Sequence, residues 1–135
     1  MRVGLSAHNP ALIETCEEKS WDVDYYMCAL HYLSRTHEEW QKLLGNDLPL
    51  GEIYLASDPP KMFAVIQKTK KPCLVYKVLA AGRTVESAAQ VRQAFETAFK
   101  KIKSSDALIV GMTTQFGDHV AENVATARAI LAKTK

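Results

Sequence analysis

Hydrophobic positions along this chain follow two alternating patterns. Four short, nearly continuous apolar runs predict buried strands at residues 3–6, 23–29, 73–79 and 107–112. Between them, apolar residues recur every three or four positions, which predicts helices that begin near Pro10, Thr36, Ser57, Thr84 and Asp118. The last helix carries an apolar stripe that we expect to be buried, formed by Val120, Val124, Ala127 and Leu131.

Polar residues mark the ends of several of these helices. Asn9 is placed to cap the first helix, and the missing N–H of Pro10 costs nothing in a first turn. Thr36 and Glu39 match the capping-box pattern, and the Gly-Asn pair at 45–46 is expected to end their helix after Leu44. The two longer helices are expected to run to about residues 68 and 103. The segment 46–57 has no clear period and is predicted to be a loop.

The order of elements is a strand followed by a helix, repeated four times. Such alternation predicts an α/β fold in which parallel strands are joined by right-handed crossovers and covered by helices. Two architectures fit: a small open sheet, or a (β/α)4 half of a TIM-type (β/α)8 barrel, because a complete barrel needs about 250 residues. No linker interrupts the chain, so residues 1–135 are predicted to form a single domain. Because the chain begins almost inside its first strand, we expect it to derive from a longer protein.

Composition narrows the range of partners. Seventeen Lys and Arg against 15 Asp and Glu leave a net charge of +2, which is too small to indicate a nucleic-acid partner. No apolar run approaches the roughly 18 residues of a membrane span, and no export signal precedes the first strand.

Cys16, Cys28 and Cys73 are widely spaced among apolar residues, so we expect buried free thiols in a cytoplasmic protein. The histidines lack metal-ligand spacing and there is no nucleophile elbow, so we assign neither a metal ligand nor a catalytic residue.

Ligands of parallel α/β proteins bind where the strands end, at their carboxyl edge. There the first predicted strand supplies Ser6 and then Asn9, although a helix cap is the stronger interpretation of Asn9. Lys77 interrupts an apolar strand, which is costly unless its ammonium reaches water or an anion. After the fourth strand, Gly111 and the hydroxyl of Thr113 precede a helix N-terminus, the combination that suits a phosphate.

Four stretches in chain order resemble the C-terminal half of the aldo-keto reductases. VGLSAHNP at 3–10 is similar to that family's strand-five signature, and WDVDYY at 21–26 falls where its sixth strand lies. PCLVYKVLAAG at 72–82 resembles strand seven, and VGM at 110–112 with the Glu-Asn pair at 122–123 resembles strand eight and its helix. The likeness covers nearly the whole chain.

The resemblance implies that this chain binds a nicotinamide dinucleotide, NADP or NAD. The residues it assigns to the cofactor are Ser6, Asn9, Tyr26, Tyr76, Lys77, Leu79, Gly111, Thr113, Thr114, His119, Glu122 and Asn123. Among these, Tyr76 would stack on the nicotinamide, Lys77 and Leu79 would follow the pyrophosphate, and Glu122 would approach the adenine. Thr113 and Thr114 stand where the family holds the adenosine 2′-phosphate, and Tyr26, or else Tyr25, replaces a glutamine of the sixth strand.

Two hypotheses for function follow. In the first, the chain is the dinucleotide-binding half of a carbonyl oxidoreductase; the family's catalytic Asp, Tyr, Lys and His come from four earlier units that this chain lacks. In the second, it is a non-catalytic half-barrel module that binds an unknown ligand or assembles with a partner.

An open four-stranded parallel sheet leaves two unpaired edges and an uncovered face. We therefore expect a homodimer or higher oligomer, or association with a missing N-terminal half.

Overall fold

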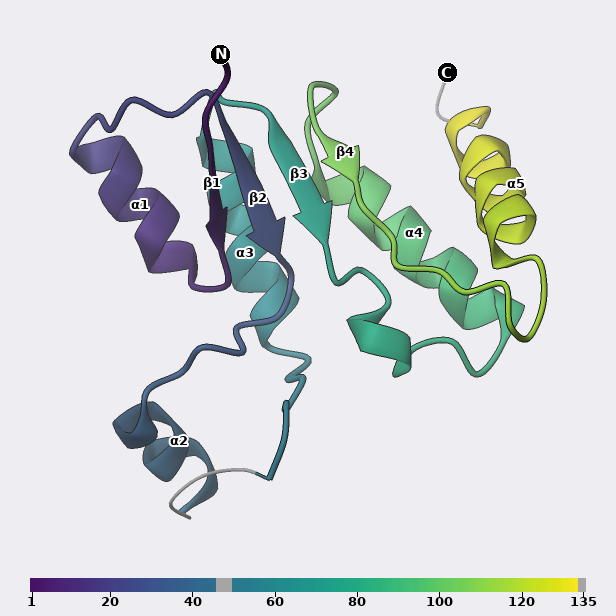
Figure 1. Ribbon diagram of the computed structural model, residues 1–135, viewed down its shortest axis with the longest axis horizontal. Coiled ribbons are helices and arrows are strands. Elements are labelled where there is room, and N and C mark those ends of the chain that lie inside the picture. The colour runs from purple at the N-terminus through teal and green to yellow at the C-terminus, as the bar shows by residue number, and fades with distance from the viewer. Residues whose placement is uncertain (46–49, 134–135) are drawn as a thin grey trace.

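Four parallel strands form one sheet in this computed structural model, which describes residues 1–45 and 50–133. The strands are β1 (Gly4–Ala7), β2 (Tyr25–Ala29), β3 (Cys73–Tyr76) and β4 (Ala107–Leu108). They lie in the order β1-β2-β3-β4, so each crossover moves the chain one strand further in the same direction (Figure 1). The predicted α/β class and the parallel strands are confirmed.

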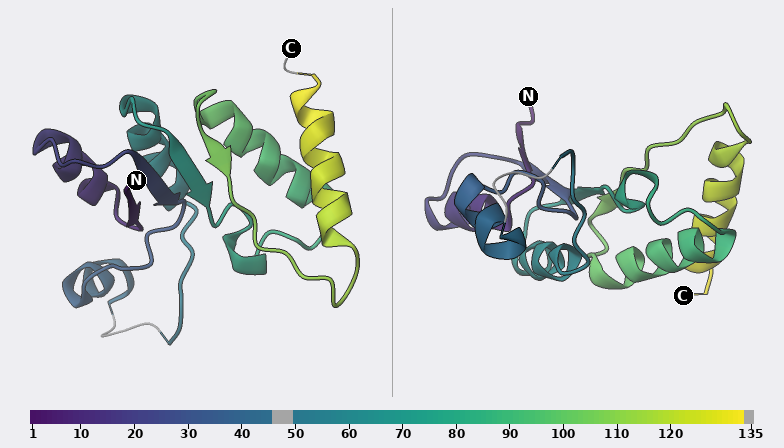
Figure 2. Two further views of the ribbon diagram at one scale, coloured as in Figure 1. Left: turned by 45° about the horizontal axis from the view of Figure 1, so that its top comes forward. Right: turned by 90° about the horizontal axis from the view of Figure 1, so that it is seen from below.

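The helices are α1 (Pro10–Glu18), α2 (His37–Leu44), α3 (Asp58–Lys68), α4 (Ala88–Lys101) and α5 (His119–Leu131), with a 3-10 turn η1 (Ala80–Gly82) after β3. Figure 2 shows α3 and α4 along the same face of the sheet. Asn9 caps α1, and the reciprocal capping box of Thr36 and Glu39 opens α2, as predicted. Gly45 ends α2 with a φ of 68°, whereas Asn46 lies outside the described residues. None of the described helices has the length and apolar character needed to cross a membrane.

The core lies between the sheet and the helices α1, α3 and α4. Strand residues alternate between the two faces of a sheet, and Tyr26, Cys28, Cys73 and Val75 all point toward the helices, where they are fully buried. Complete burial of an aliphatic side chain such as that of Val75 gains about 1.5–3 kcal/mol, so this layer contributes to the hydrophobic stabilisation of the fold. The three cysteines are buried free thiols, as predicted.

The opposite face of the sheet, which is turned to the viewer in Figure 1, is covered by no helix among the described residues. Its side chains include Ser6, which is exposed, and Tyr25 and Met27, which are half-buried. The ring of Tyr25 lies across Gly4, where a Cβ would stand only 2.3 Å from two ring carbons. A glycine is therefore required at this position of β1 for the ring to lie flat.

Several predicted boundaries are wrong at the carboxyl ends of the strands. The third strand stops at Tyr76 instead of residue 79, because Lys77 adopts a φ of 60° that turns the chain out of the extended path. The fourth strand pairs only over Ala107–Leu108, although the amide of Ile109 still donates to a β3 carbonyl. The long helix begins at Ala88, capped by Ser87 and not by Thr84, because residues 83–84 form a turn and residues 86–87 a bend. Of the predicted loop at 46–57, residues 50–57 form a loop and 46–49 lie outside the described residues.

The expectation for the last helix is also wrong in part. Val120, Val124 and Leu131 are between 40% and 46% exposed, and only Ile130 of α5 is buried. The helix lies beyond β4 at the end of the sheet (Figure 1), where the described part of the chain supplies no further strand to cover its apolar side. Ala127, a member of the predicted stripe, is half-buried against the core.

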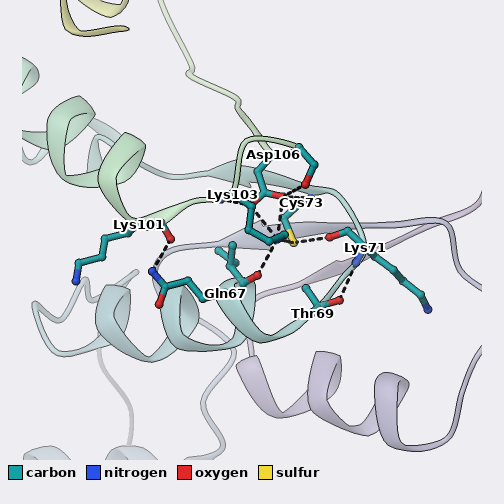
Figure 3. Close-up of polar contacts among 9 residues, drawn as sticks. Gln67, Thr69, Lys71, Cys73, Lys101, Lys103 and Asp106 are labelled. Carbon is teal, nitrogen blue, oxygen red and sulfur yellow. Dashed lines mark hydrogen bonds and ion pairs between the residues drawn. The ribbon is translucent and has the colours of Figure 1, made fainter. Parts of the chain in front are cut away.

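The amino ends of β3 and β4 are held together by the buried carboxylate of Asp106. Its Oδ1 accepts a hydrogen bond from the amide of Cys73 at 2.8 Å, and its Oδ2 accepts one from the amide of Lys103 at 2.8 Å. The Lys103 ammonium lies 2.9 Å from the same carboxylate, and Figure 3 shows the side chains of Lys103 and Asp106 together in this network. This network is at the end of the sheet opposite the candidate site.

Candidate functional site

A cavity of about 940 Å³ opens at the carboxyl ends of β3 and β4. Its walls are the segment from Tyr76 through the 3-10 turn, the first turn of α4, the segment 109–113 after β4, and the first turn of α5. Four segments that are distant in sequence meet there because parallel strands bring their carboxyl ends to one edge. Ligand pockets for small molecules measure about 300–1,000 Å³, so this cavity is large enough for a dinucleotide.

Most of the predicted cofactor residues line this one cavity. They are Tyr76, Lys77, Leu79, Gly111, Thr113, His119, Glu122 and Asn123. Ser6 lies beside it, since its Oγ is 3.4 Å from the Tyr76 hydroxyl. Thr114 does not line the cavity, although its neighbour Thr113 does.

Two of the predicted residues lie elsewhere. Tyr26 points into the core layer, where its hydroxyl donates to the carboxylate of Glu17. Burial raises the pKa of Tyr26, and hydrogen bonds to Cys16 and Glu17 raise it further. Tyr26 therefore does not reach the cavity, and its neighbour Tyr25 is the tyrosine on the open face of the sheet. Asn9 caps α1 through its Oδ1, and its amide nitrogen donates to the hydroxyl of Tyr32.

The backbone is strained where it leaves β3. Lys77, Ala80 and Ala81 have φ values of 60°, 47° and 51°, and Gly82 follows with 87°. A left-handed conformation costs a residue with a side chain about 1–3 kcal/mol, and such strain clusters at ligand-binding sites. Two of these three residues with side chains, Lys77 and Ala81, line the cavity, so part of this strain lies in its wall.

A loop segment, residues 50–57, which we call the strap, holds both cations of this region. The Lys77 ammonium donates to the Tyr54 hydroxyl at 2.8 Å and lies 3.5 Å from the Glu52 carboxylate. The Arg83 guanidinium stacks 4.1 Å from the centre of the Tyr54 ring and donates to the Glu52 carbonyl. Burial lowers the pKa of Lys77, but the hydrogen bond to Tyr54 and the charge of Glu52 outweigh it and raise the pKa overall. Lys77 is thus a positioned cation in the cavity wall.

The strap is anchored by a buried ion pair at the start of α3. The Asp58 carboxylate accepts from the Arg35 guanidinium and from the amide of Tyr32, and the Arg35 and Asp58 side chains are 4% and 1% exposed. The guanidinium also lies 4.7 Å from the centre of the Tyr32 ring and 5.1 Å from that of Trp40. These contacts bring the chain that follows β2 back toward the sheet.

The hydroxyl of Tyr76 is held by two residues from the exit of β1. Besides Ser6, the Nε2 atom of His8 lies 3.3 Å from it, and the two rings meet edge to face at 5.6 Å. Burial and the nearby charge of Lys77 lower the pKa of His8, so the neutral imidazole is favoured. The tyrosine ring is therefore fixed in orientation before any ligand arrives.

Comparison of the chain with protein-family models, curated proteins and solved structures returned no match.

The site must accordingly be interpreted from its own residues. In the described part of the chain, no group of three or more His, Cys, Asp or Glu side chains could hold a metal ion. Three residues of the site were not predicted: His8, Glu52 and Tyr54. His8 could have been found, because it stands in the same short motif as Ser6. The two strap residues had no comparable signal, because their contacts with Lys77 bridge more than 20 positions of an irregular loop.

Proposed function

We propose that this chain is the dinucleotide-binding half of an aldo-keto-reductase-like carbonyl oxidoreductase, using NAD or NADP. The observation that carries the proposal is the convergence of eight residues, all assigned to the cofactor from the sequence, on one cavity at the carboxyl edge of a parallel sheet. That edge is where ligands of parallel α/β proteins bind. The sheet order, which follows the chain order, supports the further proposal of a (β/α)4 half of a TIM-type barrel.

The residues present fit the chemistry of such a cofactor. The immobilised ring of Tyr76 offers a flat apolar surface for the nicotinamide, which supplies hydride-transfer chemistry when bound. Lys77 offers a cation for the pyrophosphate, and Gly111 and Thr113 offer close backbone approach and a hydroxyl. The general acid for carbonyl reduction would have to come from a chain segment or partner outside this unit.

The open edges of the sheet favour an assembled form of the protein. We propose that a second copy of the chain, or an N-terminal half supplied separately, pairs with the β1 and β4 edges. Exposed apolar side chains near those edges support this: Val3, Ile109 and Met112 are each at least 40% exposed. Sedimentation at micromolar concentration is expected to give at least twice the chain mass of 15.0 kDa, and a monomer would contradict self-association. If the assembly binds no dinucleotide, the non-catalytic module becomes the better interpretation.

Titration of the purified chain with NADH and NADPH, followed by nicotinamide fluorescence, tests the cofactor. We expect saturable binding that weakens by about ten- to a hundredfold in Lys77→Met, since a hydrogen bond to a charged group contributes about 1.5–3 kcal/mol. Lys100→Met, which removes an exposed ammonium from the far end of α4, serves as the matched control and should bind normally. Absence of binding at millimolar cofactor, with the fold verified by circular dichroism, would contradict the proposal.

A further inference from the structure

The ring of Tyr54 in the strap is surrounded by nitrogen-bearing side chains from three other segments. The Lys77 ammonium lies 5.2 Å from the ring centre and the Arg83 guanidinium 4.1 Å from it, while the His31 ring lies 4.9 Å away, centre to centre. His31 follows β2, Lys77 follows β3 and Arg83 follows η1, so the carboxyl edge of the sheet brings these groups together. Two like charges in one place repel each other, and the Glu52 carboxylate, 3.5 Å from the Lys77 ammonium, offsets that repulsion.

His31 contributes a buried nitrogen that lacks a partner among the described residues. The residue is 7% exposed, and its Nδ1 atom makes no hydrogen bond. Buried polar atoms of native proteins nearly always have a partner, so this nitrogen is available to a ligand. Burial lowers the pKa of His31, and the charges of Lys77 and Arg83 lower it further, against the opposing charge of Asp58 and the backbone of Leu55. An anion would accept a hydrogen bond from the imidazole and reduce the positive potential around it.

The strap is anchored at Asp58 but loosely held where it begins. Leu50 is fully exposed, and Gly51 has a φ of 90° with no atom within 4 Å of the position that a Cβ would take. The Glu52 side chain is 56% exposed, and an exposed ion pair contributes little net stability. Segments with few buried apolar contacts open locally at a low free energy. Glu52 and Tyr54 can therefore move away while the anchor at Asp58 stays in place.

We propose that the strap is a displaceable plug over an oxyanion site. When Glu52 and Tyr54 leave, Lys77, Arg83 and His31 bind a phosphate-type dianion, which brings twice the charge of the carboxylate that it replaces. A guanidinium holds such an anion through its planar fork, and an ammonium holds it as a point charge. Arg83 does not line the cavity, so this site lies at the cavity rim. The inference goes beyond the proposed function, because the site takes a free dianion as well as the phosphate group of a larger ligand.

Sulfate, a dianion at neutral pH, is the probe. The full chain is titrated with sodium sulfate at pH 7 and at constant ionic strength, and the imidazole protons of His31 are followed by nuclear magnetic resonance. We expect a saturable change in the His31 resonance, because the anion contacts the imidazole and the Tyr54 ring, now 4.9 Å away, is displaced. The resonance of His37, which is exposed on α2, should stay unchanged in the same spectra.

Two kinds of variant separate the site from its plug. Arg83→Met should weaken sulfate binding by about tenfold or more, whereas Arg128→Met, the same change at an exposed position in the last turn of α5, should bind normally. Tyr54→Ala should tighten sulfate binding by about three- to tenfold, because the plug loses its hydrogen bond and its cation–π contacts. Glu52→Gln, which keeps the ring, should also tighten it.

The inference is overturned if sulfate leaves the His31 resonance of the folded chain unchanged, or if neither strap variant binds sulfate more tightly than the wild type. In the second case the strap would be a part of the site and not its plug. A parallel titration with NADH distinguishes this failure from that of the proposed function. Binding of NADH without a sulfate site removes the plug alone, whereas binding of sulfate without NADH removes the cofactor and leaves the plug.

Discussion

Asp106 offers a direct test of what holds the amino ends of β3 and β4 together. Its side chain is fully buried and accepts from two backbone amides, those of Cys73 and Lys103, as well as from the Lys103 ammonium (Figure 3). Asparagine has nearly the same shape, but it replaces one of the two acceptor oxygens by an NH2 group and removes the charge. In Asp106→Asn, the side-chain NH2 group therefore faces one of the two backbone N–H groups, and that hydrogen bond is lost. The Lys103 ammonium also loses its carboxylate partner.

The magnitude follows from these contacts. A hydrogen bond to a charged group contributes about 1.5–3 kcal/mol, and breaking a buried ion pair by removing one partner costs about 3–5 kcal/mol. The partial exposure of Lys103 lets water compensate it in part, so we expect a loss of about 3 kcal/mol for Asp106→Asn. A domain of this size has about 5–15 kcal/mol of stability, so the variant should still fold while its unfolded fraction rises by on the order of a hundredfold.

Urea unfolding followed by far-ultraviolet circular dichroism measures this loss. The midpoint should fall without a change in slope, since a slope change would report an altered unfolded or native state. The matched control is Ser105→Ala, because the exposed Ser105 hydroxyl is 3.5 Å from the same carboxylate; it should change stability by less than about 0.5 kcal/mol. If Asp106→Asn were as stable as this control, the carboxylate would not be what joins the two strands.

Three further predictions concern other parts of the fold. Gly4→Ala should lower the free energy of unfolding by about 1–2 kcal/mol, because the new methyl displaces the Tyr25 ring; the same change in a Tyr25→Ala background should cost less than half as much. Asp58→Asn should cost about 3 kcal/mol by leaving the buried Arg35 guanidinium uncompensated, whereas adding Arg35→Met should recover part of that loss in the same urea assay. Burial lowers the pKa of His31, so its contribution to stability is present above about pH 6.5 and is lost as the pH falls below it, because the unfolded chain then binds the proton first. The pH dependence of the unfolding midpoint between pH 7 and 5 should therefore be shallower in His31→Gln, and an unchanged slope would contradict the assignment.

The sequence alone determined the class of the fold and most of the element order. Apolar periodicity is a local property of the chain, so a run such as 73–79 or the helix after Thr36 could be recognised without knowing any partner. The caps were readable for the same reason, since Asn9 and Thr36 bond to amides within three residues of themselves. The motifs assigned Tyr76, Gly111 and Glu122 to one site although they are distant in sequence. The parallel sheet brings these three residues to one cavity.

Tertiary structure decided what depends on contacts between distant segments. Pairing fixes where a strand stops, so β4 is far shorter than its apolar run. Tyr25 and Tyr26 lie on opposite faces of the sheet, because neighbouring residues of a strand point to opposite faces. The strap reaches Lys77 only through the folding of an irregular loop, and the exposure of Val124 on α5 reflects the absence of a covering strand among the described residues. Sequence patterns carry local preferences, whereas burial and ligand geometry arise from which surfaces the whole chain brings together.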